Sequence, residues 1–218
     1  MDRRRLPISA HLPTDVIRAA YGDGAQLLSA AEFNSTMRDG IDPVANERGF
    51  VSRKSGWVRK EATGGISFFK VQRHEKAVDP HAGGRFTLEF ERSADNKPLM
   101  GLAGRARFDQ LLPRADLRRV VDYQRKVISS LPRPPAEWVN SGPDFLRETY
   151  LENFSSNFPY DPGNLWLRYQ SLEHVRGWLD VITALLPAVL ERTARMDPGT
   201  IYLGALIDLN ADPLGSSD

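Results

Sequence analysis

The sequence predicts an α+β fold, an antiparallel sheet of about four or five strands with helices packed mainly on one face. Residues 85–92, "RFTLEFER", alternate apolar and polar side chains, which is typical of an antiparallel strand. Residues 172–196 instead repeat apolar side chains at helical spacing. The predicted elements follow the order helix, strands, helices, strand, helix, and this order favours α+β over a parallel sheet.

Composition indicates an ordinary globular protein. The chain has 218 residues, of which 41% are hydrophobic and 26% charged, and its net charge is +1. A chain of this length can bury a core without a disulfide or a metal, so we expect no cofactor. The absence of cysteine excludes thiolate nucleophiles and zinc–thiolate sites. No apolar run approaches the roughly 18 residues of a membrane span, so we expect a cytoplasmic protein without a membrane partner.

Three regions are expected along the chain. Residues 1–24 contain prolines and glycines without periodicity and predict an irregular lead-in. Residues 25–196 form the predicted α+β domain. Residues 197–218 carry four aspartates and no basic residue, which indicates an acidic tail or, at "TIYLGALI", an edge strand.

Two helices are expected at the start of the domain. The first covers about 25–39. Asp42 and Pro43 resemble an N-cap and a first helical position, so a second short helix is predicted at 43–48. Gly49 is the expected stop of this second helix.

Three extended runs come next, at 56–62, 66–73 and 85–92. A Gly64-Gly65 turn separates the first two. In the third run, phenylalanine and leucine side chains are expected to point inward, and the charged side chains outward to water. The inward set is Phe86, Leu88 and Phe90, and the outward set is Arg85, Thr87, Glu89 and Glu91.

The second half of the chain is predicted to be mainly helical. Apolar spacing indicates a helix over 116–131, and a further helix is expected over about 143–153. A short strand at 165–170 precedes the long helix at 172–196. Ser171 is the expected N-cap of that helix, and Pro187 is expected to kink or divide it.

The stretch "QRHEKAVDPHAGG" contains the first catalytic candidates, His74, Glu75 and His81. Across a loop these side chains could converge on a divalent metal. The alternative is a polar connection between two strands, with Asp79-Pro80 and Gly83-Gly84 as turn residues. The second interpretation is favoured.

Residues 48–76 form a basic strip. They include eight basic residues and two glutamates, which gives a formal charge of +6. Aromatic residues are interleaved, a combination that suits single-stranded nucleic acid. Strand alternation argues against a single basic surface, because Arg59 and Lys60 must point to opposite faces. The candidate binding residues are Arg53, Lys54, Trp57, Arg59, Lys60, Gln72, Arg73 and Arg85.

A third cluster joins Trp166 and Arg168, which share a strand face, to His174 and Trp178 on the last helix. This cluster could line a pocket. The favoured interpretation places Trp178 in the core and His174 in a hydrogen-bonded first turn. No nucleophile elbow, P-loop or dinucleotide fingerprint is present in the sequence.

Part of the chain resembles a bacterial domain-of-unknown-function family, number 4304. The similarity lies in Gly49-Phe50, Arg53-Lys54, Gly56-Trp57, Gln72-Arg73 and Gly84-Arg85-Phe86, and in the closing "WLRYQSLEHVRGWLDVITALLPAVLER". His74 stands where that family commonly has serine, and the long middle section has no counterpart. The resemblance implies an α+β fold and gives no activity. Related small bacterial domains often neutralise toxins or act as accessory proteins, so it favours binding over catalysis.

Three functions are therefore considered. The first is a non-enzymatic, immunity-like or accessory protein that binds a macromolecule, with another protein as the expected partner. The second is a metal-dependent hydrolase that uses His74, Glu75 and His81. The third is a nucleic-acid binder that uses the basic strip.

Overall fold

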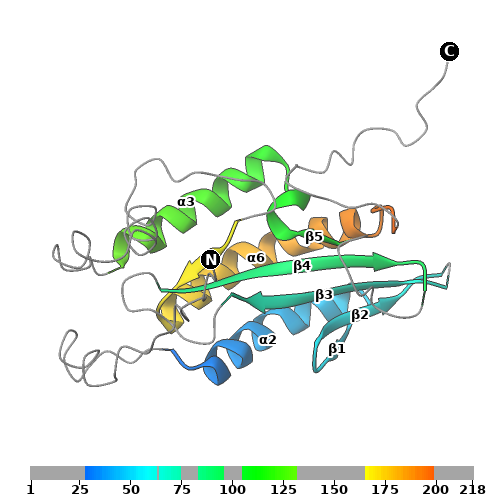
Figure 1. The fold of residues 1–218 in the computed structure, drawn as a ribbon, viewed down its shortest axis with the longest axis horizontal. Coiled ribbons are helices and arrows are strands. Elements are labelled where there is room, and N and C mark those ends of the chain that lie inside the picture. Colours follow the sequence, from blue (N-terminus) through cyan, green and yellow to red (C-terminus); the bar gives the residue numbers. More distant parts are fainter. Residues whose placement is uncertain (1–27, 63, 75–82, 96–104, 132–164, 199–218) are drawn as a thin grey trace, which may run out of the picture.

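The computed structural model describes residues 28–62, 64–74, 83–95, 105–131 and 165–198. These residues form an antiparallel sheet and a layer of helices, so the α+β prediction is confirmed (Figure 1). The predicted lead-in, the helix at 143–153 and "TIYLGALI" lie outside the described residues. Among the residues described, no helix is long and apolar enough to cross a membrane.

The sheet has six strands in the described part of the chain. Five follow the order β1-β2-β3-β4-β5, and β6 pairs with β4 on the same edge as β5. Every pairing is antiparallel. The strands are β1 (Val51–Arg53), β2 (Gly56–Lys60), β3 (Ile66–Arg73), β4 (Gly84–Ser93), β5 (Arg105–Arg107) and β6 (Leu167–Tyr169).

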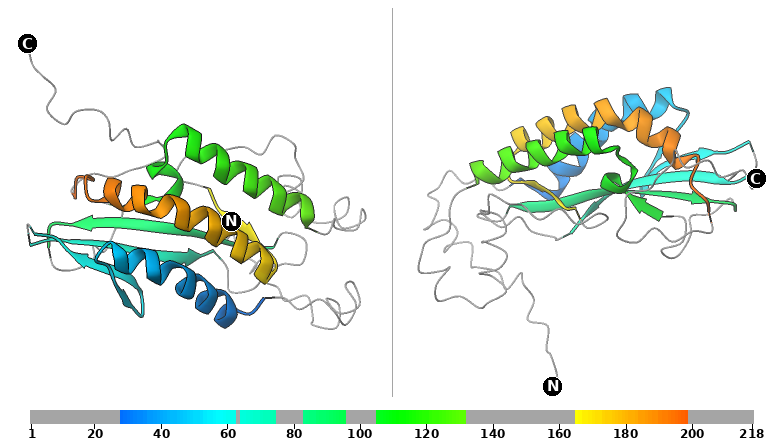
Figure 2. Two further views of the ribbon diagram at one scale, coloured as in Figure 1. Left: turned by 180° about the vertical axis from the view of Figure 1, so that it is seen from behind. Right: turned by 90° about the horizontal axis from the view of Figure 1, so that it is seen from above.

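All described helices cover one face of the sheet, which we call the inner face (Figure 2). They are α2 (Ala30–Glu47), α3 (Arg114–Ser130), α6 (Leu172–Thr193) and the 3-10 helix η1 (Phe108–Leu111). A row of stacked rings crosses the strands beneath them. Trp57 stacks on Phe69 at 4.8 Å between ring centroids, and Phe69 stacks on Phe90 at 5.5 Å. Such aromatic burial is a large part of the hydrophobic stabilisation.

Helix α2 corrects the prediction of two helices divided at Pro43. It is one helix from Ala30 to Glu47 with Pro43 inside it. Proline in a helix interior costs about 3 kcal/mol. Each large apolar side chain that becomes fully buried contributes about 1.5–3 kcal/mol. The continuous buried stripe of Phe33, Met37, Ile41 and Ala45 runs past the proline and outweighs its cost.

The ends of α2 follow local rules. Ser29 and Glu32 form a capping box at the start. Gly49 has φ of 76°, which glycine adopts without strain, and it follows the helix as the sequence predicts.

Helix α6 begins as predicted, with the Ser171 hydroxyl accepting a hydrogen bond from the His174 amide at 3.3 Å. It continues through Pro187 as one element, so of the two expected outcomes at this residue, a kink or a division, the division does not occur. Buried side chains lie on both sides of the proline, at Ile182 and Val189 among others. As in α2, packing of a continuous apolar stripe holds the helix together.

The burial of the side chains on β4 corrects the prediction that one face of this strand points to water. Phe86, Leu88 and Phe90 point into the core as expected. The alternate side chains at Thr87, Glu89 and Glu91 are also buried, at 1%, 7% and 3% exposure, so this face is not simply wet. The two carboxylates are accommodated because cationic side chains of β3 and β5 lie beside them.

Candidate functional site

Strand alternation divides the predicted binding residues between the two faces of the sheet. Trp57 points inward and is 3% exposed, and its Nε1 donates to Asp42 Oδ1 at 2.6 Å. Its ring lies in the core stack. Trp57 therefore belongs to the core and cannot stack on a nucleic-acid base.

Arg59 also lies on the inner side. Its guanidinium lies 4.8 Å from the centroid of the Phe50 ring, and it forms an ion pair with Glu61 at 3.0 Å. Burial alone would raise the pKa of Glu61, but hydrogen bonds from Ser67 and Arg59 outweigh it and lower that pKa. The positive charge of Arg59 thus interacts with other groups of the folded chain.

Arg73 is the third inward residue of the predicted set. Its guanidinium lies 5.9 Å from the centroid of the Phe33 ring and hydrogen-bonds the hydroxyl of Tyr169. Burial raises the pKa of Tyr169, and Arg73 opposes that rise. These contacts remove Arg73, like Trp57 and Arg59, from the surface that the basic strip was expected to form.

The remaining candidates face the other way. The pairing registers place a second set of side chains on what we call the outer face, opposite the described helices. Lys54 is in the turn between β1 and β2. The outer face comprises Val51, Arg53, Val58, Lys60, Ile66, Phe68, Lys70, Gln72, His74, Arg85, Thr87, Glu89, Glu91, Ser93, Arg105, Arg107, Trp166 and Arg168.

Opposite charges meet in the middle of the outer face. Lys70 Nζ lies 3.1 Å from Glu89 Oε2, and Arg105 reaches the same oxygen at 3.8 Å. Arg105 also lies 3.5 Å from Glu91. These pairs are partly buried, so water and salt screen them less than exposed pairs.

One end of the outer face, which we call the cationic end, consists of His74, Arg85 and Arg168. Arg85 and Arg168 are directly opposed across β4 and β6. The His74 amide donates to the Arg85 carbonyl at 2.9 Å, which extends the pairing of β3 and β4 by one residue. All three residues have interaction partners in the folded chain. Residues far apart in sequence are therefore joined into one basic row.

Trp166 lies next to the cationic end. The His74 ring meets it edge-on, with centroids 4.6 Å apart. On the same ring, the guanidinium of Arg107 lies 4.7 Å from the centroid. Sequence reasoning placed Trp166 and Arg168 on one strand face but did not bring Arg107 or His74 to them, because these contacts depend on pairing between distant strands.

Of the three candidate catalytic residues, the structure describes only His74, because Glu75 and His81 lie outside the described residues. Within the ranges given above, no group of three or more His, Asp or Glu side chains could hold a metal ion. The metal-dependent hydrolase therefore stays a prediction.

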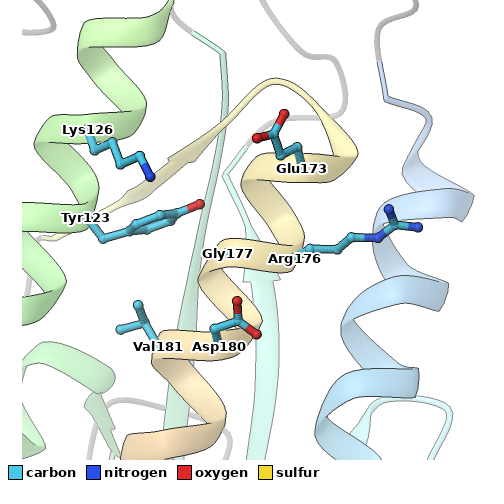
Figure 3. A pocket seen from close by; sticks show the side chains of 7 residues that line it. All are labelled: Tyr123, Lys126, Glu173, Arg176, Gly177, Asp180 and Val181. Carbon is cyan, nitrogen blue, oxygen red and sulfur yellow. The ribbon is translucent and has the colours of Figure 1, made fainter.

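A shallow groove of about 420 Å³ lies between α3 and α6 (Figure 3). Tyr123 points from α3 towards α6, with Glu173 and Asp180 on either side of its hydroxyl. Burial, followed by these two carboxylates, raises the pKa of Tyr123. The hydroxyl donates to the His174 carbonyl at 3.2 Å, and the ring packs over Gly177, where a Cβ would lie 1.9 Å from the oxygen. Tyr123 thus joins the two helices.

His174 is held neutral beside this groove. Its Nδ1 accepts the Gln170 amide at 3.2 Å, so the ring proton resides on Nε2, which lies 3.0 Å from Ser130 Oγ. The Ser130 hydroxyl in turn donates to Val127 O at 2.7 Å. Burial lowers the pKa of His174, against the smaller opposing effect of Glu173. His174 therefore has the structural role that the sequence favours, and Trp178 is buried in the core.

On the outer face only four of the side chains are exposed, Val51, Arg53, Lys60 and His74, and seven are buried, Ile66, Phe68, Thr87, Glu89, Glu91, Ser93 and Arg168. No family model, curated protein or solved structure matches the chain, so the resemblance to family number 4304 stays a prediction.

Proposed function

We propose that this chain is a non-enzymatic accessory or immunity-like protein that binds a macromolecule, expected to be another protein, on the outer face of its sheet. The observation that carries this proposal is the face itself. It holds seven lysine and arginine residues and two glutamates over six strands, and the described helices all pack on the opposite side.

Several features of the outer face suit binding. His74 at one end of the face, Lys60 at the other and Arg53 on β1 are exposed. Val51 is 51% exposed at the edge of the sheet and adds apolar surface. A rigid sheet holds these groups at fixed spacings, so less entropy is lost on binding than for the same groups on a loop.

The test is capture from a native lysate with a double variant of the face. Lys60→Glu with Arg85→Glu reverses one charge at each end of the outer face. The matched control reverses Arg119 and Arg125, which are exposed on α3. Both variants change the net charge equally, so non-specific electrostatic attraction falls equally in both.

We expect a specific protein to be retained by the wild type and the control and to be lost from the face variant, with and without nuclease. Retention by all three proteins would contradict the outer face as the binding surface. Retention that disappears on nuclease treatment would replace a protein partner with a nucleic acid.

A further inference from the structure

We infer, on the basis of the proposed function, that the free edge of β1 binds an extended acidic segment of a protein partner, which joins the sheet there as an additional strand. We call this side of Val51–Arg53 the open edge. Three observations support the site. The opposite edge of the sheet is closed by buried side chains, the β1–β2 hairpin carries exposed cations, and Val51 is exposed beside them.

The opposite edge of the sheet has its backbone groups occupied. Gln124 is fully buried, and its amide donates to the Trp166 carbonyl at 2.8 Å and accepts the Arg168 amide at 2.9 Å. A residue of a neighbouring parallel strand would form the same two hydrogen bonds with β6. Trp178 Nε1 donates to the next carbonyl of β6 at 2.7 Å, and buried Gln110 accepts a backbone amide of β5 at 2.8 Å. These backbone groups are not available to a further strand.

Strand β1 forms the other edge. Within the described residues it pairs on one side only, with β2, at the margin of the sheet (Figure 1). An edge of this kind presents backbone N–H and C=O groups that an added strand can satisfy. Arg38 of α2 donates to Ser52 Oγ and, at 3.0 Å, to the Arg53 carbonyl. These bonds hold β1 in place before a partner arrives, which lowers the entropy lost on binding.

The cations of the β1–β2 hairpin select an acidic segment. Arg53, Lys54 and Lys60 are exposed, and none of the ion pairs among the described residues involves them. Arg59, by contrast, pairs with Glu61 at 3.0 Å. If two copies of β1 paired with each other, these cations would be brought together, and like charges across paired strands are destabilising. The charges therefore favour an acidic partner over a second copy of this chain.

Strand geometry sets the pattern of the partner. Arg53 and Val51 are alternate residues on the outer face, about 7 Å apart at a rise of roughly 3.4 Å per residue. Val51 is 51% exposed, and Lys60 lies one such step beyond Val58, the residue opposite Val51. An added strand with an apolar side chain beside Val51 thus directs its alternate neighbours towards Arg53 and towards Lys60. We expect carboxylates at both of these positions.

The open edge also favours a protein over a nucleic acid. A phosphate chain could contact the exposed cations, but it has no peptide backbone to pair with β1. An extended peptide satisfies both the charges and the edge, with main-chain hydrogen bonds for affinity and alternate side chains for specificity.

The experiment measures the binding of two labelled peptides to the full chain by fluorescence anisotropy at low salt. The first peptide has the central order glutamate, threonine, valine, threonine, glutamate, which places both carboxylates and the valine on one face of a strand. The second has the same composition in the order glutamate, valine, threonine, glutamate, threonine, which places the carboxylates on opposite faces. Arg53→Gln removes a charge at the open edge, and Arg125→Gln, on the exposed side of α3, is the matched control. Thermal unfolding confirms that both variants are folded.

We expect the first peptide to bind more tightly than the second, because only the first directs its carboxylates and its valine to the same face as Arg53 and Val51. Arg53→Gln should weaken binding of the first peptide about fivefold, which is the upper end for one exposed ion pair, and Arg125→Gln should weaken it less than about twofold. Added salt should reduce the affinity of the first peptide for the wild type.

Equal affinities of the two peptides would overturn the inference, since binding would then depend on charge and not on a strand register. Equal losses in the two variants would also overturn it, because the peptide would then bind away from the open edge. If neither peptide binds, but capture from lysate is still lost in the double variant of the outer face, the proposed function stands and the acidic strand at β1 is wrong.

Discussion

The two faces of the sheet use the same residue types for different purposes. On the inner face, arginines are part of the folded core: Arg59 covers Phe50, and Arg92 donates to the Met196 carbonyl at 2.7 Å. On the outer face, arginines lie in rows with a few glutamates or, at Arg85 and Arg168, beside each other. A count of basic residues along the strands therefore overstates the charge that a partner can meet.

The largest expected difference between the faces is in the free energy of unfolding that is lost when their tryptophans are replaced. Trp57→Ala should lower the free energy of unfolding by about 3–5 kcal/mol, because a buried ring is lost from the core stack. Trp166→Ala, on the outer face, should cost less, about 1–2 kcal/mol. Urea unfolding followed by circular dichroism measures both values. Equal losses would show that the outer face is packed as a second core.

A smaller effect is expected from the central ion pairs. Glu89→Gln leaves Lys70 and Arg105 without their shared carboxylate oxygen, and should lower the free energy of unfolding by about 1–2 kcal/mol. The deficit should shrink in 1 M salt, where charge interactions are screened. The same measurement on Trp57→Ala provides the control, since its deficit should not shrink. A Glu89→Gln deficit that is independent of salt would mean that packing, not charge, accounts for it.

The smallest effect concerns pH and belongs to the helical layer over the inner face. The pKa of His174 is lower in the folded chain than its ordinary value of 6.5, because burial disfavours the charged ring. The unfolded chain therefore binds the proton more readily. The contribution of His174 is fully present above pH 6.5 and is lost as the pH falls below it.

The measurement for His174 is the free energy of unfolding of the wild type and His174→Gln between pH 8 and pH 5. Charged groups near the ring include Glu173 on α6, whose carboxylate opposes the shift. We expect the wild type to lose more stability than the variant over this range. Parallel curves would show that His174 does not titrate differently in the folded and unfolded chains.

Local patterns predicted the regular elements well. The bounds of β3 were predicted at 66–73, and the Ser171 cap was also correct, because both depend on neighbours in the sequence. The continuity of α2 through Pro43 was missed, since it depends on burial against other elements. Strands β1 (VSR) and β5 (RAR) were missed because these short runs are poor in apolar residues, whereas β6, equally short, lies in the apolar run at 165–170.

The candidate site was predicted only in part. Alternation within β2 correctly separates Arg59 from Lys60, but the sequence alone did not show which of them faces the helices. That choice is decided by Phe50 and Glu61, which hold Arg59 on the inner side. The opposition of Arg85 and Arg168 depends on a pairing between distant strands, and no local pattern indicates such a register.

Strand β4 has one further consequence, which concerns when the chain acquires its surface. One edge of β4 pairs with β3, and the other edge pairs with both β5 and β6. A newly made chain that ends before residue 165 already contains Arg85 but cannot yet place Arg168 opposite it. The paired arginines are thus completed only when β6 has been synthesised and joins the sheet, so they distinguish chains that contain β6 from shorter precursors.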